Sequence, residues 1–120
     1  MVLKTILVVE DESAIREAME ILLSSTYRVT LARNGEEALT KLAGEEVDLL
    51  IVDLWMPHGE GEKVLRELRQ TGHQLPVITM SADQDRLERT RALGADDVLV
   101  KPFSVRALEE KVTGLLAPLR

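Results

Sequence analysis

Residues 49–57 read LLIVDLWMP, and this stretch decides the fold. Its four leading residues are aliphatic without any alternation, which is typical of a strand covered on both faces. Strands of this kind belong to parallel sheets, because the connecting helices pack on both sides of the sheet. The run ends at Asp53, so we expect a buried strand to present a carboxylate at one edge of a parallel sheet.

Other apolar runs repeat this pattern along the chain. Three resemble the first run: ILVV at 6–9, PVITM at 76–80 and VLV at 98–100. A fifth candidate, YRVTLA at 27–32, alternates and is expected at the edge of the sheet. Between the runs, apolar residues recur with helical period in three stripes: Ile15, Met19, Leu22 and Leu23; Val64, Leu65 and Leu68; Val105, Leu108, Val112, Leu115 and Leu116. The alternation predicts an α/β fold, an open doubly wound parallel sheet of five strands with helices on both faces.

Helix boundaries can also be predicted. Ser13 and Ser104 are expected to cap the N-termini of two helices, because their hydroxyls can accept a hydrogen bond from a free backbone N–H. The dipeptide at 34–35, Asn-Gly, is expected to turn the edge strand into the next helix. Pro118 is expected to end the last helix.

Length and composition exclude several classes of protein. We expect the 120 residues to form one domain, residues 1–120, with no disulfide or thiolate metal site because cysteine is absent. The net charge of -6 disfavours direct binding of nucleic acid by this chain. The N-terminal apolar stretch is too short for a signal peptide, and no run approaches the roughly 20 apolar residues of a membrane span. We therefore expect a soluble, cytoplasmic protein without a membrane partner.

Polar residues follow the expected strands where each strand ends. In open α/β sheets, ligands bind outside the carboxyl ends of the strands, so these residues should converge on one rim. They are Glu10 and Asp11, Asp53, Ser81, and Lys101 followed by Pro102. The rim therefore combines three carboxylates, a hydroxyl and an ammonium group.

The charges on this rim limit which ligands and reactions the site can support. Two carboxylates 4 Å apart repel by about 4 kcal/mol at an effective dielectric constant of 20. Lys101 offsets one charge, and the remainder favours a divalent cation with oxygen ligands, for which Mg²⁺ is the natural candidate. A carboxylate beside Mg²⁺, a lysine and a hydroxyl is equipped to accept a phosphoryl group, with Asp53 as the nucleophile.

The chain resembles the receiver domains of two-component response regulators over essentially its whole length. Four motifs in the same order carry the resemblance: VVEDE at 8–12, VDLWMP at 52–57, ITMSA at 78–82 and GADDVLVKPF at 94–103. The resemblance implies a CheY-like fold with strand order 2-1-3-4-5. It also implies that the protein is a switch rather than an enzyme: a sensor histidine kinase or a histidine phosphotransfer protein donates the phosphoryl group, and the switch acts on an output domain or partner.

The resemblance also assigns roles to individual residues. Asp53 would be the phospho-acceptor, and Mg²⁺ would be held by Asp11, Asp53 and the backbone carbonyl of Trp55, with Glu10 acting through water. Ser81 and Lys101 would contact the phosphoryl oxygens. The peptide bond between Lys101 and Pro102 is expected to be cis, which is rare. The last two helices and the last strand would form the output face.

The chain departs from the family pattern at several positions. Val98 lies where the family usually has an aromatic ring that reports phosphorylation by swinging inward. Readout is therefore expected to rely on the loop after Ser81 and on a helix over about 83–93. Trp55 and Asp83 flank the expected path of the attacking water, where Trp55 could shield the acyl phosphate or Asp83 could orient the water. The loop PHGEGEK at 57–63 is also atypical.

Several other residues are given structural interpretations. His58 and His73 are read as loop residues without a metal or phosphoryl role. GEGEK at 59–63 lacks the spacing of a phosphate-binding loop and is read as a polar turn entering a helix. The run DQDRLERTRALG at 83–94 is read as a solvated helical face, with a partner surface as the alternative. On the last helix, Arg106, Glu109 and Glu110 form a possible contact face.

Two other functions remain open on the sequence. One is a docking module that works without phosphorylation, to which Val98 lends some weight. The other is a Mg²⁺-dependent phosphohydrolase that passes through the same aspartyl phosphate. The second is disfavoured because Trp55 replaces the second aspartate that haloacid-dehalogenase-type phosphatases need, and because the chain has no cap domain. The fourth and least favoured hypothesis is a flavodoxin-like protein that binds a cofactor.

Overall fold

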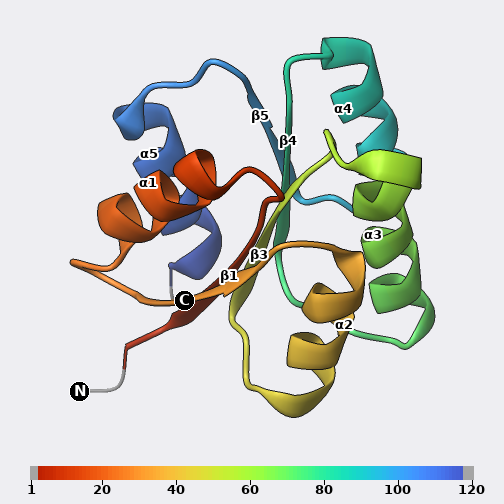
Figure 1. Cartoon of the computed structure of the whole chain (residues 1–120), viewed down its shortest axis with the longest axis horizontal. Coiled ribbons are helices and arrows are strands. Elements are labelled where there is room, and N and C mark those ends of the chain that lie inside the picture. Colours follow the sequence, from red (N-terminus) through yellow and green to blue (C-terminus); the bar gives the residue numbers. More distant parts are fainter. Residues whose placement is uncertain (1–2, 118–120) are drawn as a thin grey trace.

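The fold was analysed in a computed structural model that describes residues 3–117. Strands and helices alternate along the chain (Figure 1). The expected end of the last helix at Pro118 lies outside the described residues. The elements are β1 (Thr5–Val9), α1 (Ser13–Leu23), β2 (Arg28–Ala32), α2 (Gly35–Gly44), β3 (Leu49–Asp53), the 3-10 turn η1 (Pro57–Gly59), α3 (Glu60–Gln70), β4 (Val77–Ser81), α4 (Gln84–Ala92), β5 (Asp97–Val100) and α5 (Val105–Leu116).

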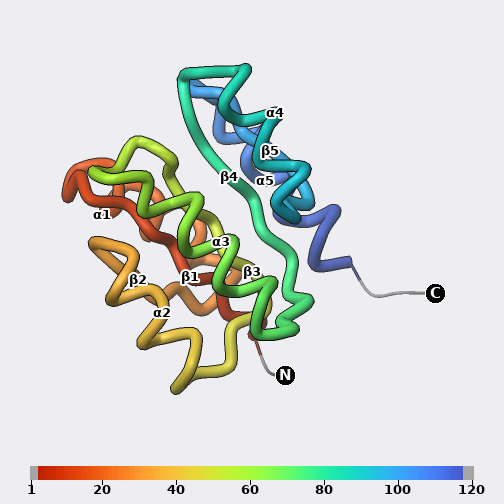
Figure 2. Tube along the Cα trace, turned by 90° about the vertical axis from the view of Figure 1, so that its right-hand side faces the viewer, coloured from red at the N-terminus to blue at the C-terminus, as the bar shows by residue number. Residues whose placement is uncertain are grey.

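The five strands form one parallel sheet in the order β2-β1-β3-β4-β5. Figure 1 shows α1 and α5 on one face of the sheet and α2, α3 and α4 on the other. In Figure 2 the face covered by α2, α3 and α4 is turned toward the viewer. The predicted doubly wound α/β fold and its strand order are confirmed, and β2 is an edge strand as expected. Successive strands are added on one side of β1 first (β2) and then on its other side (β3, β4 and β5), so the strand order reverses between β1 and β3. In such sheets, ligands bind in the crevice at the carboxyl ends of the two strands where the order reverses.

The central strand β3 explains why the sheet needs cover on both sides. All five of its residues are buried, and side chains alternate between the faces. Leu49 and Ile51 pack in the cluster beneath α1 and α5, whereas Leu50 and Val52 pack in the cluster beneath α2 and α3. At about 1.5–3 kcal/mol for each fully buried aliphatic side chain, this strand is held in place by both layers. Asp53, its last residue, is therefore carried on a rigid support.

Helix α4 has a small contact region of its own. Leu87 of α4 packs with Leu54 and Val98 in a separate cluster. Beside it, the Thr79 and Thr90 hydroxyls, both buried, are 2.8 Å apart and join β4 to α4 by a hydrogen bond. The helix therefore rests on few apolar contacts and one buried polar link.

Three local expectations differ from the structure. The N-cap of α1 is Glu12, not Ser13, and no side chain caps this helix, because Ser13 is already its first helical residue. Residues 60–63 form the first turn of α3 rather than a polar turn before it, since η1 alone makes the turn. Val105 is exposed at 45%, because it begins α5 beyond the edge of the core. Ser104 does cap α5, accepting a hydrogen bond from the Ala107 N–H.

Gly61, in the first turn of α3, lies against the strand that carries Asp53. A Cβ atom there would be 2.8 Å from the Asp53 carbonyl oxygen and 3.2 Å from the Leu54 Cα atom. Real Cβ atoms do not come this close to backbone, so only glycine allows α3 to start here. The close approach fixes α3 relative to the backbone of Asp53.

We expect Gly61→Ala to lower the free energy of unfolding by about 1–3 kcal/mol, because α3 must move away from Asp53 and Leu54. Gly114→Ala is the matched control: it lies within α5 with open space around it and should raise stability by about 0.5–1 kcal/mol. Urea denaturation of both variants measures the effect. Equal stability of the two variants would contradict the packing described for Gly61.

Candidate functional site

Three carboxylates meet at the carboxyl ends of β1 and β3. Glu10 and Asp53 are each only 1% exposed, whereas Asp11 is exposed. One carboxylate oxygen from each residue lies within 4.8 Å of the others. The sequence analysis expected these groups to converge, and the structure brings them together.

Lys101, directly after β5, offsets one charge of this cluster. Its ammonium nitrogen lies 2.7 Å from Asp53 Oδ2 and 3.2 Å from Glu10 Oε1. The backbone holds the lysine in place, because the Lys101 N–H donates to the Ser81 carbonyl at 2.9 Å. One ammonium group therefore contacts two buried carboxyl groups.

Burial and charge shift two pKa values at this site. Burial raises the pKa of Glu10 to about 7 from an ordinary 4.5, helped by a hydrogen bond to Asp53 and by the negative charge of Asp53. Lys101 and the Glu12 N–H only partly oppose this shift. Burial would lower the pKa of Lys101, but its hydrogen bond to Asp53 and the two carboxylate charges outweigh burial and raise it. The Lys101 ammonium therefore stays charged, while Glu10 can hold a proton near neutral pH.

The remaining polar contacts orient Asp53 and Ser81. The Trp55 N–H donates to Asp53 Oδ1 at 2.9 Å, so the backbone binds one oxygen of this carboxylate and Lys101 binds the other. Ser81 is 2% exposed at the end of β4, and its Oγ atom accepts a hydrogen bond from the Asp83 N–H at 3.0 Å. The Asp83 carboxylate in turn caps α4 by accepting from the Arg86 N–H.

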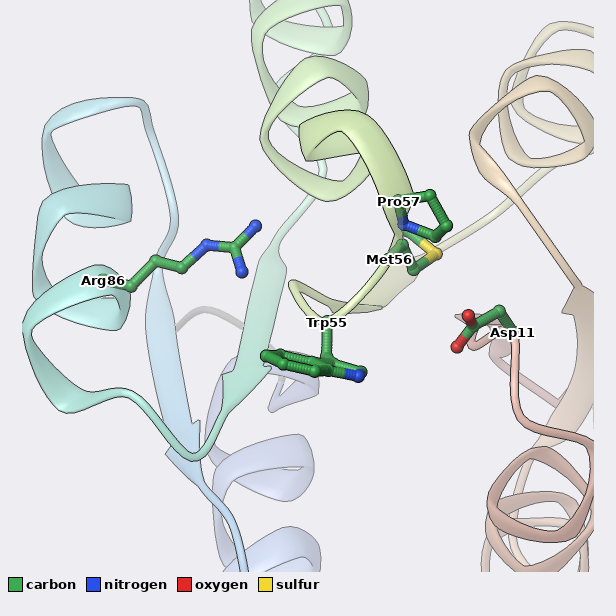
Figure 3. Close-up of a pocket in the computed structure, with 5 residues that line it drawn as sticks. All are labelled: Asp11, Trp55, Met56, Pro57 and Arg86. Atoms are coloured by element: carbon green, nitrogen blue, oxygen red, sulfur yellow. The ribbon is translucent and has the colours of Figure 1, made fainter.

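An open hollow of about 320 Å³ lies at the mouth of the site. It is lined by Asp11, Trp55, Met56, Pro57 and Arg86 (Figure 3). Figure 3 shows Arg86 reaching in from α4 on one side and Asp11 on the other, with Trp55 between them. The Trp55 side chain is 77% exposed. The Trp55 indole would therefore lie at the entrance of a site that holds a small group at the carboxylates.

Comparison with known proteins identifies the family. The profile described as the response regulator receiver domain matches residues 6–113. The chain belongs to the response regulator receiver domains. It is a receiver domain of the two-component systems, as the sequence motifs predicted.

Relatives agree with this assignment. Response regulator MprA of Mycobacterium avium is 42% identical over 114 residues, covering 92% of this chain and 50% of that protein. The receiver domain thus spans about half the length of the mycobacterial regulators that it matches. Among solved structures, response regulator TrrA of Thermotoga maritima, in complex with Mg²⁺ and BeF, has a TM-score of 0.85 at 38% identity over 94% of this chain and 99% of that one. The receiver domain of Francisella response regulator 1452 has a TM-score of 0.87 at 30% identity, covering 93% and 95% of the two chains.

Other expected features of this receiver domain can now be located. The Lys101–Pro102 peptide bond is cis, as the resemblance implied. Val98 is 7% exposed and packs beneath α4. His58 lies in η1 and His73 in the loop after α3, both exposed. No helix within residues 3–117 combines the length and the apolar character that crossing a membrane requires.

Sequence reasoning missed two side chains near this site. The run at 83–94 was read as a solvated face, but Arg86 is only 23% exposed and forms an ion pair with Glu62 of α3. Arg16 of α1 was not singled out, yet its guanidinium donates to the backbone carbonyls of Glu10 and Asp11. No sequence signal distinguishes these arginines from surface ones, because their partners depend on how helices and turns sit against each other.

We expect the pKa of Glu10 to make the stability of the metal-free domain depend on pH. Between pH 4.5 and about 7 the unfolded state loses this proton while the folded state keeps it, so the contribution of Glu10 to stability falls as pH rises through that window. Below the window it is fully present. Urea denaturation in EDTA across this range, for the native protein and Glu10→Gln, isolates the effect as a difference. Parallel stability profiles for the two proteins would refute the raised pKa.

Proposed function

We propose that Asp53 accepts a phosphoryl group and that the whole chain, residues 1–120, acts as one phosphorylation-dependent switch. The observation that carries the proposal is the Lys101 ammonium shared between Glu10 and Asp53 at the mouth of a receiver fold. A carboxylate oxygen of Asp53 would form the new bond to phosphorus while the bond from phosphorus to the donor nitrogen breaks. The protein would contribute to this transfer by neutralising charge and by aligning the reacting groups.

The residues around Asp53 would divide this work. Lys101, already 2.7 Å from Asp53, would neutralise charge on the transferred group. Ser81 has a hydroxyl proton to donate to a phosphoryl oxygen, because in its present hydrogen bond with Asp83 the Oγ atom is the acceptor. The Trp55 N–H would hold one carboxylate oxygen in position.

The acidic cluster fits Mg²⁺. Its donors are all oxygens, and their spacing within 4.8 Å suits an ion that binds ligands at about 2.1 Å on opposite sides. We propose that Asp11, Asp53 and the backbone carbonyl of Trp55 hold the ion and that Glu10 contacts it through water. When bound, Mg²⁺ would supply the positive charge that in-line phosphoryl transfer needs.

Partners and output form part of the same proposal. A sensor histidine kinase or a histidine phosphotransfer protein would supply the phosphoryl group, and a cytoplasmic location follows from such a donor. The face formed by α4, β5 and α5 would contact the output domain or partner. Exposed Val100 and Val105, together with the ion pairs of Asp97 with Arg91 and Lys111, give this face both apolar and charged character.

Replacing Asp53 tests the proposal. We expect Asp53→Asn to abolish the mass gain of one phosphoryl group that the native protein shows with acetyl phosphate and Mg²⁺, because the amide is not a nucleophile. Asp85→Asn is the matched control, since Asp85 is an exposed aspartate of α4 outside the acidic cluster. Intact-mass spectrometry gives the readout. If the native protein gains no phosphoryl group with Mg²⁺ present, the docking module becomes the better explanation.

Trp55 is expected to set how long the phosphoryl group persists. We propose that its exposed indole shields the acyl phosphate from water, because the Asp83 carboxylate is already engaged in capping α4. Trp55→Ala should then shorten the half-life of phosphorylated Asp53 severalfold, whereas Trp55→Phe should shorten it less. Loss of the phosphoryl group is followed by mass after the donor is removed. An unchanged half-life in Trp55→Ala, with a longer one in Asp83→Asn, would show instead that Asp83 orients the water.

Readout without an aromatic ring at position 98 is proposed to use the loop after Ser81 and helix α4. Val98 has no ring to swing, whereas the loop is hydrogen-bonded directly to Ser81. A pair of crystal structures with and without Mg²⁺ and beryllofluoride should show this loop and α4 displaced. Identical positions in both structures would refute this route.

A further inference from the structure

Besides the packing of Leu87 and the Arg91–Asp97 ion pair, two polar side-chain contacts at separated points tie helix α4 to the rest of the domain. Toward its C-terminal end, the buried hydroxyls of Thr90 and Thr79 tie it to β4. In its first turn, Arg86 binds Glu62 of α3 through two hydrogen bonds, Nε to Oε2 at 2.6 Å and Nη2 to Oε1 at 2.8 Å. Among the ion pairs of residues 3–117, this pair is the only one that joins two helices.

The geometry of this pair gives it more weight than an exposed ion pair. The two side chains are only 16% and 23% exposed, and both donors lie on one edge of the guanidinium, so the contact is bidentate. The hydrogen bond to Glu62 raises the pKa of Arg86, and the charges of Asp83 and Asp53 add to the shift. Arg86 is therefore fixed by Glu62 and also lies within the field of the acceptor carboxylate.

Both ends of the pair are linked to the acceptor site. On the α4 side, the Arg86 N–H donates to the Asp83 side chain, and the Asp83 N–H donates to Ser81 Oγ. On the α3 side, Glu62 follows Gly61, whose backbone packs against the Asp53 carbonyl. These contacts would transmit a movement of Ser81 to the first turn of α4, while the close approach at Gly61 holds α3 against Asp53.

We propose that the Glu62–Arg86 pair is a latch that holds the first turn of α4 against α3 until Asp53 is phosphorylated, and that α4 then turns about the Thr79–Thr90 contact. This inference rests on the proposed phosphorylation of Asp53. Phosphorylation would draw the Ser81 hydroxyl toward the phosphoryl oxygens, and the hydrogen bonds that run from Ser81 through Asp83 to the Arg86 N–H would pull the first turn of α4 away from Glu62. Leu87, which is fully buried against Leu54 and Val98, also holds this part of α4, and the latch adds a polar contact between the first turn and α3.

The latch makes a measurable thermodynamic prediction. If only the unlatched domain binds a phosphoryl mimic well, opening the latch raises the competent fraction and tightens apparent binding. Glu62→Gln and Arg86→Gln should each tighten beryllofluoride binding in Mg²⁺ by about fivefold or more. The double variant should gain no more than either single variant, since both remove the same contact. Isothermal titration calorimetry gives the dissociation constants.

A second measurement needs no phosphoryl mimic. In the unphosphorylated variants, the backbone amides of the first turn of α4 should exchange with deuterium faster than in the native protein. Amides around Thr90 should keep native rates, because their tether is intact. Arg89→Gln is the matched control: it removes the same charge from the same helix, but Arg89 is exposed and forms no ion pair within the described part of the chain.

The outcomes separate the latch from the proposed function. Native exchange rates in Glu62→Gln and Arg86→Gln, equal to those of Arg89→Gln, would overturn the latch. Weaker binding in Arg86→Gln with tighter binding in Glu62→Gln would overturn it too, because Arg86 would then be a ligand of the phosphoryl group. Failure of the native protein to bind beryllofluoride would count against the proposed phosphorylation of Asp53 but not against the latch. The exchange rates would still test the latch.

Discussion

The position of the Lys101 ammonium between Glu10 and Asp53 is the interaction on which the rest of the site depends. Two carboxylates that are each 1% exposed would otherwise repel one another where little water screens them. The arrangement also needs the sheet order, because β1, β3 and β5 must end at the same rim for these three residues to meet. The parallel topology is thus the structural condition for the chemistry.

Burial of the central strand connects packing with this chemistry. β3 is enclosed by two apolar layers, and its end is held further by Gly61 on one side and by the Trp55 N–H on the other. The acceptor side of the site is therefore rigid. By contrast, α4 is held by one small apolar cluster around Leu87 and a few polar contacts, so any conformational response is expected to concentrate there.

The sequence was sufficient for the fold and for the convergence of Glu10, Asp11, Asp53 and Lys101 at one rim, because both follow from periodicity. Unbroken runs such as 49–52 specify buried parallel strands, and residues such as Asp53 and Lys101 follow directly from where the strands end. The Glu62–Arg86 pair could not be predicted, since it depends on the relative position of two helices that no local pattern encodes. The N-cap of α1 was missed for a related reason: local propensity favours Ser13 as the cap, but the turn after β1 makes Ser13 the first helical residue and leaves Glu12 at the cap position.

The near-neutral pKa of Glu10 has a consequence for how cation binding would be observed. An ion entering the cluster competes with the proton on this carboxyl group, so part of the population must release a proton to the buffer on binding. The heat of binding would then contain the ionisation enthalpy of the buffer. The same titration in PIPES and in Tris, which differ in ionisation enthalpy, would give different heats for one binding constant, and the number of protons released follows from that difference.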